Sequence, residues 1–221
     1  MSNTLAPFGF DAVCSNLGVA YVPRLNYFPI ISGYAANIFL KAPVIYARVA
    51  GALTGPSINN ILTNTSPILG IATQFNIYTG IGVIPSPFNV YWASGTLAAT
   101  GTTPMCGVEC DPNVLFNVQY VSSSDSHGDL SALTANANST VGTASGNFNS
   151  GNTANGQSTA GIDVISATNA GAANLPFKVV QLAPVPNNQF AVSNNFLYNY
   201  WYVKMNNAIF NGATTSTTSG T

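Results

Sequence analysis

Residues 105–121 read MCGVECDPNVLFNVQYV, and this stretch decides the fold. In its middle, Asp111-Pro112-Asn113 has the composition of a tight turn, which we predict to be structural. Over residues 114–121, β-branched and aromatic residues alternate with a more polar set, and a period of two is typical of a half-buried strand. No repeat or helix of three turns stands out elsewhere, so the sequence predicts an all-β chain.

The chain before this stretch is rich in short apolar segments. Residues 17–49 contain runs typical of two or three strands, and Pro29 and Pro43 restrict these to edges, strand starts or bulges. Residues 69–75 alternate as a further strand, and we expect an extended piece at 88–92. The face predicted for the strand at 69–75 consists of Leu69, Ile71, Thr73 and Phe75.

Beyond the central stretch the chain turns polar and then forms strands again. Residues 139–161 read STVGTASGNFNSGNTANGQSTAG. This composition predicts an ordered, protruding loop, because proline and charge are lacking; disorder is the alternative. Before it, Asp129 or Ser131 is placed to cap one short helical turn. Strands are expected again at 175–182 and 196–205.

Two segments are candidates for contact with another protein. In the strand at 196–205, tyrosines and a lysine share one face, and tyrosine suits an interface because it packs and hydrogen-bonds at once. Residues 1–16 predict an extended arm whose apolar side chains need a neighbour. The alternatives are packing within one subunit for the tyrosines, and an arm laid across the chain's own core. The candidate contact residues are Leu5, Pro7, Phe8, Phe10, Tyr198, Tyr200 and Tyr202.

Short strands separated by turn residues are typical of a β-sandwich or barrel. We therefore expect a single jelly-roll-like β domain over residues 17–211, with the polar loop at 139–161 inside it. The N-terminal arm at 1–16 precedes this domain, and a polar tail at 212–221 follows it.

Charge is scarce in this chain. Of its 221 residues, 47% are hydrophobic but only 5% are charged, against about 25% in an average domain. Five basic residues cannot form the phosphate-neutralising patch that nucleic acid needs, nor a polybasic membrane tether. A net charge of −1 favours association, so we expect packing against copies of the chain or another protein. A compositional habit of the lineage is the alternative.

The sequence also carries expectations about the compartment in which the chain folds. Three cysteines are an odd number, which argues against a secreted disulfide framework. The opening MSNTLAPFGFDAV lacks the basic and apolar regions of a signal peptide, and no run of about 18 apolar residues is present. We expect a protein made in a reducing cytoplasm, with no membrane partner.

Three groups of residues resemble chemical sites without completing one. Cys106 and Cys110 have a spacing compatible with zinc but lack a convincing fourth ligand, and small buried thiols are the alternative. His127, in Ser-Asp-Ser-His-Gly-Asp, is the only histidine available to a nucleophile. Glu109 and Asp111 could be drawn as a glycosidase pair. We predict no catalytic residue, no metal and no cofactor.

A carbohydrate-binding module is the competing function. Polar all-β chains rich in Asn, Tyr and Trp are common among lectins and adhesins. In such a module Trp92, Trp201 and the tyrosine face would stack on sugar rings. No sequence motif supports it.

Several short motifs together resemble a known family. These are APFGF at residues 6–10, DPNVLFNVQ at 111–119, LPFKVV at 175–180 with PNN at 186–188, and WYVKMNN at 201–207. In this order they are similar to the capsid cement, or decoration, proteins of tailed bacteriophages. The resemblance covers most of the chain in outline.

The resemblance implies a structural protein that binds the outer surface of an icosahedral shell and stabilises junctions between major capsid subunits. Its partners would be the major capsid protein and further copies of itself, as a homotrimer rather than a dimer. It would be assembled in the host cytoplasm, would reside on the virion, and would be no enzyme.

Overall fold

The computed structural model describes twelve parts of the chain, and every structural statement below concerns them. They are residues 6–15, 21–22, 24–31, 33–47, 57–60, 67–76, 90–97, 102–121, 138–143, 150–163, 175–185 and 199–209. All regular elements in these parts are β-strands, arranged as several antiparallel sheets. The prediction of an all-β chain is confirmed.

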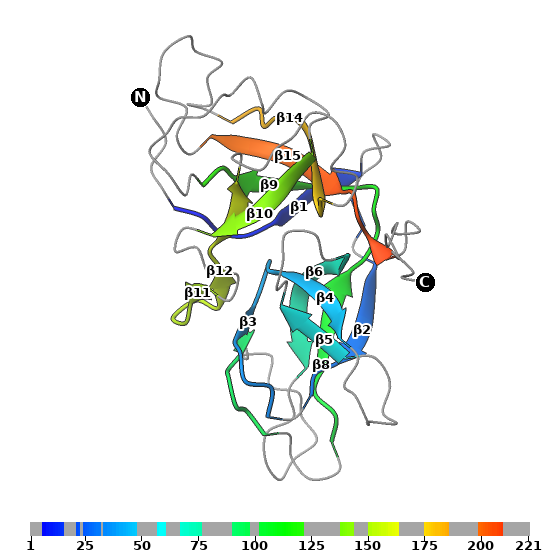
Figure 1. The fold of residues 1–221 in the computed structure, drawn as a ribbon, viewed down its shortest axis with the longest axis vertical. Helices are drawn as coiled ribbons and strands as arrows, with labels where there is room; N and C mark the ends of the chain where they lie inside the picture. Colours follow the sequence, from blue (N-terminus) through cyan, green and yellow to red (C-terminus); the bar gives the residue numbers. More distant parts are fainter. Residues whose placement is uncertain are drawn as a thin grey trace, which may run out of the picture.

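The largest sheet has six strands and lies in the upper part of Figure 1. In spatial order these are β1 (Asp11–Ser15), β9 (Val114–Gln119), β15 (Tyr200–Met205), β14 (Phe177–Leu182), β10 (Asn138–Thr143) and β13 (Ala160–Asp163). Strand β13, at the far edge of the sheet, also contacts the residues that directly follow β9, where Tyr120 and Ile162 form a parallel bridge. The N–H of Val121 donates to the carbonyl of Ile162 at 2.9 Å, so the end strand β13 is tied to the chain that continues from β9, the second strand from the opposite edge.

The second sheet has five strands and lies in the lower part of Figure 1. In spatial order these are β2 (Leu25–Pro29), β8 (Met105–Glu109), β6 (Ile68–Asn76), β4 (Pro43–Ala47) and β5 (Ser57–Asn60). Its end strands, β2 and β5, also lie near each other. Two short ribbons complete the fold, β3 (Ile38–Phe39) with β7 (Tyr91–Trp92), and β11 (Gly151–Asn152) with β12 (Gln157–Ser158).

The stretch at 105–121 joins the two sheets, because β8 belongs to one and β9 to the other. Between them is the predicted turn, in which the N–H of Asn113 donates to Oδ1 of Asp111 at 2.8 Å. The N–H of Val114 donates to the carbonyl of Asp111 at 3.2 Å. Asp111-Pro112-Asn113 thus directs the chain from one sheet into the other.

Both faces of β9 are covered, whereas the sequence predicted a half-buried strand. On the outward face Leu115 and Gln119 are buried, and Gln119 has no exposed surface. One reason is that the N-terminal segment crosses this face, where the N–H of Ala6 donates to Oε1 of Gln119 at 2.9 Å. A contact between residues so far apart in sequence is invisible to local periodicity.

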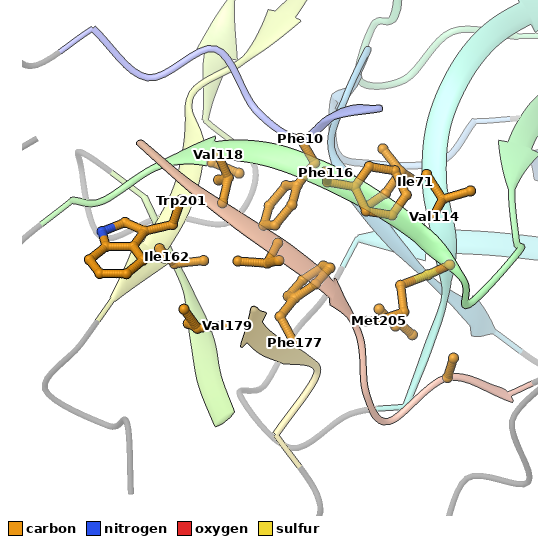
Figure 2. Close-up of a cluster of buried hydrophobic side chains, with 14 of the residues drawn as sticks. Phe10, Ile71, Val114, Phe116, Val118, Ile162, Phe177, Val179, Trp201 and Met205 are labelled. Carbon is orange, nitrogen blue, oxygen red and sulfur yellow. The ribbon is translucent and has the colours of Figure 1, made fainter. Parts of the chain in front are cut away.

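Two apolar clusters form the core. The first joins one face of the six-stranded sheet to Ile68 and Ile71 of β6, and Figure 2 shows side chains gathered from the N-terminal segment, β9, β14 and β15. Its larger members are Phe10, Phe116, Phe177, Trp201 and Met205. The second cluster lies on the face of the five-stranded sheet opposite the first cluster. It includes Ile38, Leu69, Phe75, Trp92, Cys106 and Val108.

Strand β6 contributes to both clusters, and the single face predicted for it is wrong. Ile71 lies in the first cluster, whereas Leu69 and Phe75 lie in the second. The register shifts next to Leu69 and again next to Thr73, so the side-chain alternation is reset twice. The hydroxyl of Thr73 donates to the carbonyl of Gly107 at 2.9 Å, across the second irregularity.

Other predicted strands are found. Residues 17–49 contain β2, β3 and β4, with Pro29 ending β2 and Pro43 beginning β4 as expected. In β15, Trp201, Val203 and Met205 are buried while the residues between them are half-buried, which confirms the predicted alternation.

The polar stretch at 139–161 differs most from expectation. Its described part is ordered, as predicted, but it forms strands instead of one protruding loop. The N–H of Leu40 donates to the carbonyl of Gly156 at 2.9 Å, and the N–H of Ser158 donates to the carbonyl of Leu40 at 2.8 Å. Gly151 lies against the ring of Phe39, where a Cβ would collide, so glycine permits this close docking.

Candidate functional site

The N-terminal segment lies across the outward face of the six-stranded sheet. The ring of Phe8 stacks on Tyr200, with centroids 5.6 Å apart, and Pro7 beside it is half-buried. Together with the hydrogen bond from Ala6 to Gln119, these contacts hold the segment on its own chain. Of the two alternatives left open by the sequence, residues 6–8 adopt the one in which the arm covers its own domain.

Phe10 is a core residue. Its ring stacks on Phe177 with centroids 4.3 Å apart, and only 1% of its surface is exposed. Its N–H donates to the carbonyl of Lys41 at 2.9 Å, and strand β1 follows immediately. The side chain predicted for an external contact therefore serves the internal packing of the chain.

The turn that sends Phe10 inward depends on Gly9. Its φ is +80°, and a Cβ there would lie 2.6 Å from the carbonyl oxygen of Lys41. Lys41 is itself left-handed, with φ of 64°. Its ammonium lies 2.8 Å from Oδ1 of Asp11 and 5.6 Å from the ring centroid of Phe8. This exposed ion pair adds little stability by itself, but it fixes the segment at both sides of the turn.

The tyrosine face is present and half-buried. Tyr200, Tyr202 and Lys204 alternate with the buried residues of β15, and Phe8 covers the Tyr200 end. Leu5 and Tyr198, the remaining predicted contact residues, lie outside the described residues. The part of this face beyond Phe8 consists of Tyr202 and Lys204.

The buried carboxylate of Glu109 is the feature that the sequence did not reveal. It has no exposed surface, and three donors converge on it. Oε2 accepts the hydroxyl of Tyr21 at 2.6 Å and the N–H of Arg24 at 3.2 Å, while Oε1 accepts the N–H of Asp111 at 2.9 Å. No cation contacts it within the described residues. Hydrogen bonds to the ionised form are the means by which such a group is tolerated.

This arrangement excludes the glycosidase pair drawn from the sequence. Glu109 is sealed from solvent, and Oδ1 of Asp111 accepts a hydrogen bond within its own turn. Both carboxylates accept hydrogen bonds from backbone N–H groups, and Glu109 has no surface open to a substrate. Burial, followed by the hydrogen bond to Glu109, raises the pKa of Tyr21 well above its ordinary value, so its hydroxyl remains a donor.

The thiol of Cys106 in β8 and that of Cys110 just after it lie in apolar surroundings. Cys106 and Cys110 are buried in the second cluster and are free. Burial raises the pKa of Cys106 well above its ordinary value and that of Cys110 to about 11, so both remain protonated at neutral pH. Among the described residues, no three of His, Cys, Asp and Glu come together as metal ligands would. His127 lies outside the described residues.

The sugar-stacking prediction for the tryptophans is wrong. Trp92 and Trp201 are buried members of the two apolar clusters, with 0% and 2% of their surfaces exposed. A ring must be open on one face to stack on a sugar. The exposed aromatic side chains in the described part are instead Tyr27 and Tyr46 of the five-stranded sheet.

In the described part of the chain, no helix is long and apolar enough to span a membrane. No protein-family model, no curated protein and no solved structure matches this chain.

Proposed function

We propose that this chain is a structural protein of a tailed-phage virion that binds the outer surface of the icosahedral shell as a cement protein. It performs no reaction; its work is to add contact area across junctions between major capsid subunits. Its partners are the major capsid protein and further copies of itself, in a homotrimer.

One observation carries this proposal: the segments that resemble the cement family are neighbours in space. The APFGF segment leads into β1, DPNVLFNVQ forms the turn and β9, LPFKVV forms part of β14, and WYVKM lies in β15. These four strands are consecutive in the six-stranded sheet. Motifs scattered over the chain thus build one continuous unit, as expected if they are inherited together.

The chemistry of the described residues supports an interface function. The candidate acids and thiols are engaged in backbone hydrogen bonds or apolar packing, as Glu109 and Cys106 illustrate. The low charge of the chain favours association with a protein surface.

We propose a finer description of the fold as well. In the six-stranded sheet, β13 reaches the chain just after β9, and in the five-stranded sheet β2 lies near β5. Both contacts support a single barrel-like or jelly-roll-like domain. An arm that reaches a neighbouring subunit would consist of residues before Ala6, because the contacts of residues 6–10 are made within the chain.

Cryo-electron microscopy of virus particles from the source of the chain tests the proposal. The expected result is density for this fold in symmetric clusters on the outer lattice. Particles stripped of the protein should lose their contents at a lower temperature and recover when purified protein is added back. Density only at a tail or fibre, or stripped particles of unchanged stability, would refute the cement function, and a glycan panel would then test the adhesin alternative.

A binding comparison locates the surface. Tyr202→Ala removes a half-buried ring from the tyrosine face, and Tyr27→Ala removes an exposed ring from the other sheet as a control. We expect Tyr202→Ala alone to weaken binding to stripped particles. Equal binding of the two variants would show that the tyrosine face is not the contact.

A further inference from the structure

Two lysines stand directly opposite each other on the outward face of the six-stranded sheet. Lys178 of β14 pairs in register with Lys204 of β15. Their neighbours on each strand, including Phe177, Val179 and Val203, are buried in the first cluster. Because side chains alternate along a strand, both lysines point away from that cluster. Both are half-buried.

This pairing is costly and conspicuous in such a chain. The whole sequence has five basic residues, and two of them occupy one cross-strand pair. Like charges directly opposite each other destabilise a sheet. In the described residues the ion pair is that of Lys41 with Asp11, so neither Lys178 nor Lys204 has an acidic partner there. Within the described part of the chain, two positive charges are therefore held together without a counter-charge.

The surroundings of the pair have the composition of a protein interface. The register continues from Lys204 to Leu115, an apolar side chain, and the next row holds Tyr202 opposite Asn117. The buried Oδ1 of Asn117 has no hydrogen-bond partner. Aromatic, apolar and amide groups thus adjoin the two lysines, beyond the Tyr200 end of β15 where Phe8 stacks.

We propose that this face binds a carboxylate of the partner protein between Lys178 and Lys204. The inference deepens the proposed function: the occupant is an acidic side chain on the outer surface of the shell protein. Charge complementarity selects it, because one carboxylate can accept from both ammonium groups and remove their repulsion. Nucleic acid would require a longer track of positive charges than a single pair.

The test measures binding of the full chain to stripped particles as a function of salt. Lys178→Gln/Lys204→Gln removes both charges, and Arg24→Gln removes one exposed charge from another part of the molecule. We expect the double variant to bind at least tenfold more weakly at low salt and to lose most of the salt dependence of the parent. Arg24→Gln should bind as the parent does. A double variant that binds like the parent at every salt concentration overturns the carboxylate site and leaves the cement function standing.

Two further measurements keep the site testable without the particle. The double variant alone should unfold at the same or a higher denaturant concentration than the parent, because the repulsion between the two lysines is relieved. A clear loss of stability would reveal a counter-ion within the chain and overturn the proposal.

A glutamate-rich peptide serves as the second probe, and its binding should be lost in the double variant. If the parent binds the peptide but no particle, the cement function fails and the site stands. If it binds no peptide, or binds a short DNA duplex equally well, the carboxylate site is refuted.

Discussion

Replacing Glu109 by Gln tests whether the hydrogen bonds to the buried carboxylate stabilise the fold. The substitution preserves volume and converts one oxygen into an NH2 group. In the native structure Oε2 accepts from Tyr21 and from the N–H of Arg24, while Oε1 accepts from the N–H of Asp111. Whichever way the amide turns, its NH2 group faces at least one donor, so at least one donor is left unpaired.

The expected cost follows from that count. Losing one hydrogen bond to a charged, buried acceptor costs about 1.5–3 kcal/mol. A neutral amide is less costly to bury than a carboxylate, so the substitution also lowers the desolvation cost and offsets part of the lost hydrogen-bond energy. We expect Glu109→Gln to reduce the free energy of unfolding by about 2 kcal/mol, equivalent to about 4–8 °C in Tm for a chain of this size.

Urea and thermal unfolding of purified protein would measure this cost. Tyr21→Phe should cost about 1 kcal/mol, because its ring is only half-buried, and the double variant should cost less than the sum of the two. Tyr27→Phe is the matched control, since the hydroxyl of Tyr27 donates to Gln74 on an exposed surface at 3.2 Å. An unchanged unfolding midpoint for Glu109→Gln would refute the hydrogen-bond argument.

Three further predictions concern the stability of the fold. Gly9→Ala should cost about 2–4 kcal/mol in denaturant unfolding, because φ is +80° and the new Cβ would meet the carbonyl of Lys41; an unchanged midpoint would contradict that close approach. Stability should fall as pH rises above 9.0, the ordinary pKa of the Cys106 thiol, because the unfolded thiol ionises there while the buried one stays protonated. Cys106→Ala should reduce this decline by about 1.4 kcal/mol per pH unit, and equal slopes for variant and parent would contradict it. Asp111→Ala should cost about 1 kcal/mol by removing the acceptor for the N–H of Asn113, whereas Asp111→Asn keeps an acceptor and should cost less; equal losses would argue against the turn hydrogen bond.

The strands that the sequence predicted well are those with uninterrupted alternation. β15 and the turn at Asp111 follow from residue types within a few positions, so local patterns suffice. β6 was predicted as a strand with the wrong face, because two register shifts interrupt its pairing and no residue type signals them. In the polar stretch at 139–161, Val141 and Phe148 stand alone among Ser, Thr, Asn, Gly, Gln and Ala, so no alternating pattern marks its strands, although its glycines permit close docking beside β3.

The candidate site was less predictable because its contacts are distant in sequence. The two donors to Oε2 of Glu109 lie 88 and 85 residues away, so nothing next to Glu109 marks it as buried. Phe10 was expected outside for the same reason, since its partner Phe177 belongs to a strand near the other end of the chain. The lysine pair appeared in the sequence as two separate charges, and only the register of β14 with β15 brings them together.

The order in which the strands meet has a consequence for how fast the chain folds. The six-stranded sheet brings β1 next to β9 and β9 next to β15, and the hydrogen bond from Ala6 to Gln119 spans 113 residues. Long chain loops must close before these strands can pair, and the entropy lost on loop closure slows that step. We therefore expect folding in milliseconds to seconds, at the slow end for domains. During that interval a chain with little charge exposes unpaired strands to its neighbours. Because β15 lies inside the sheet and is the last of its strands in the sequence, the sheet cannot be completed before residues 200–205 have been synthesised.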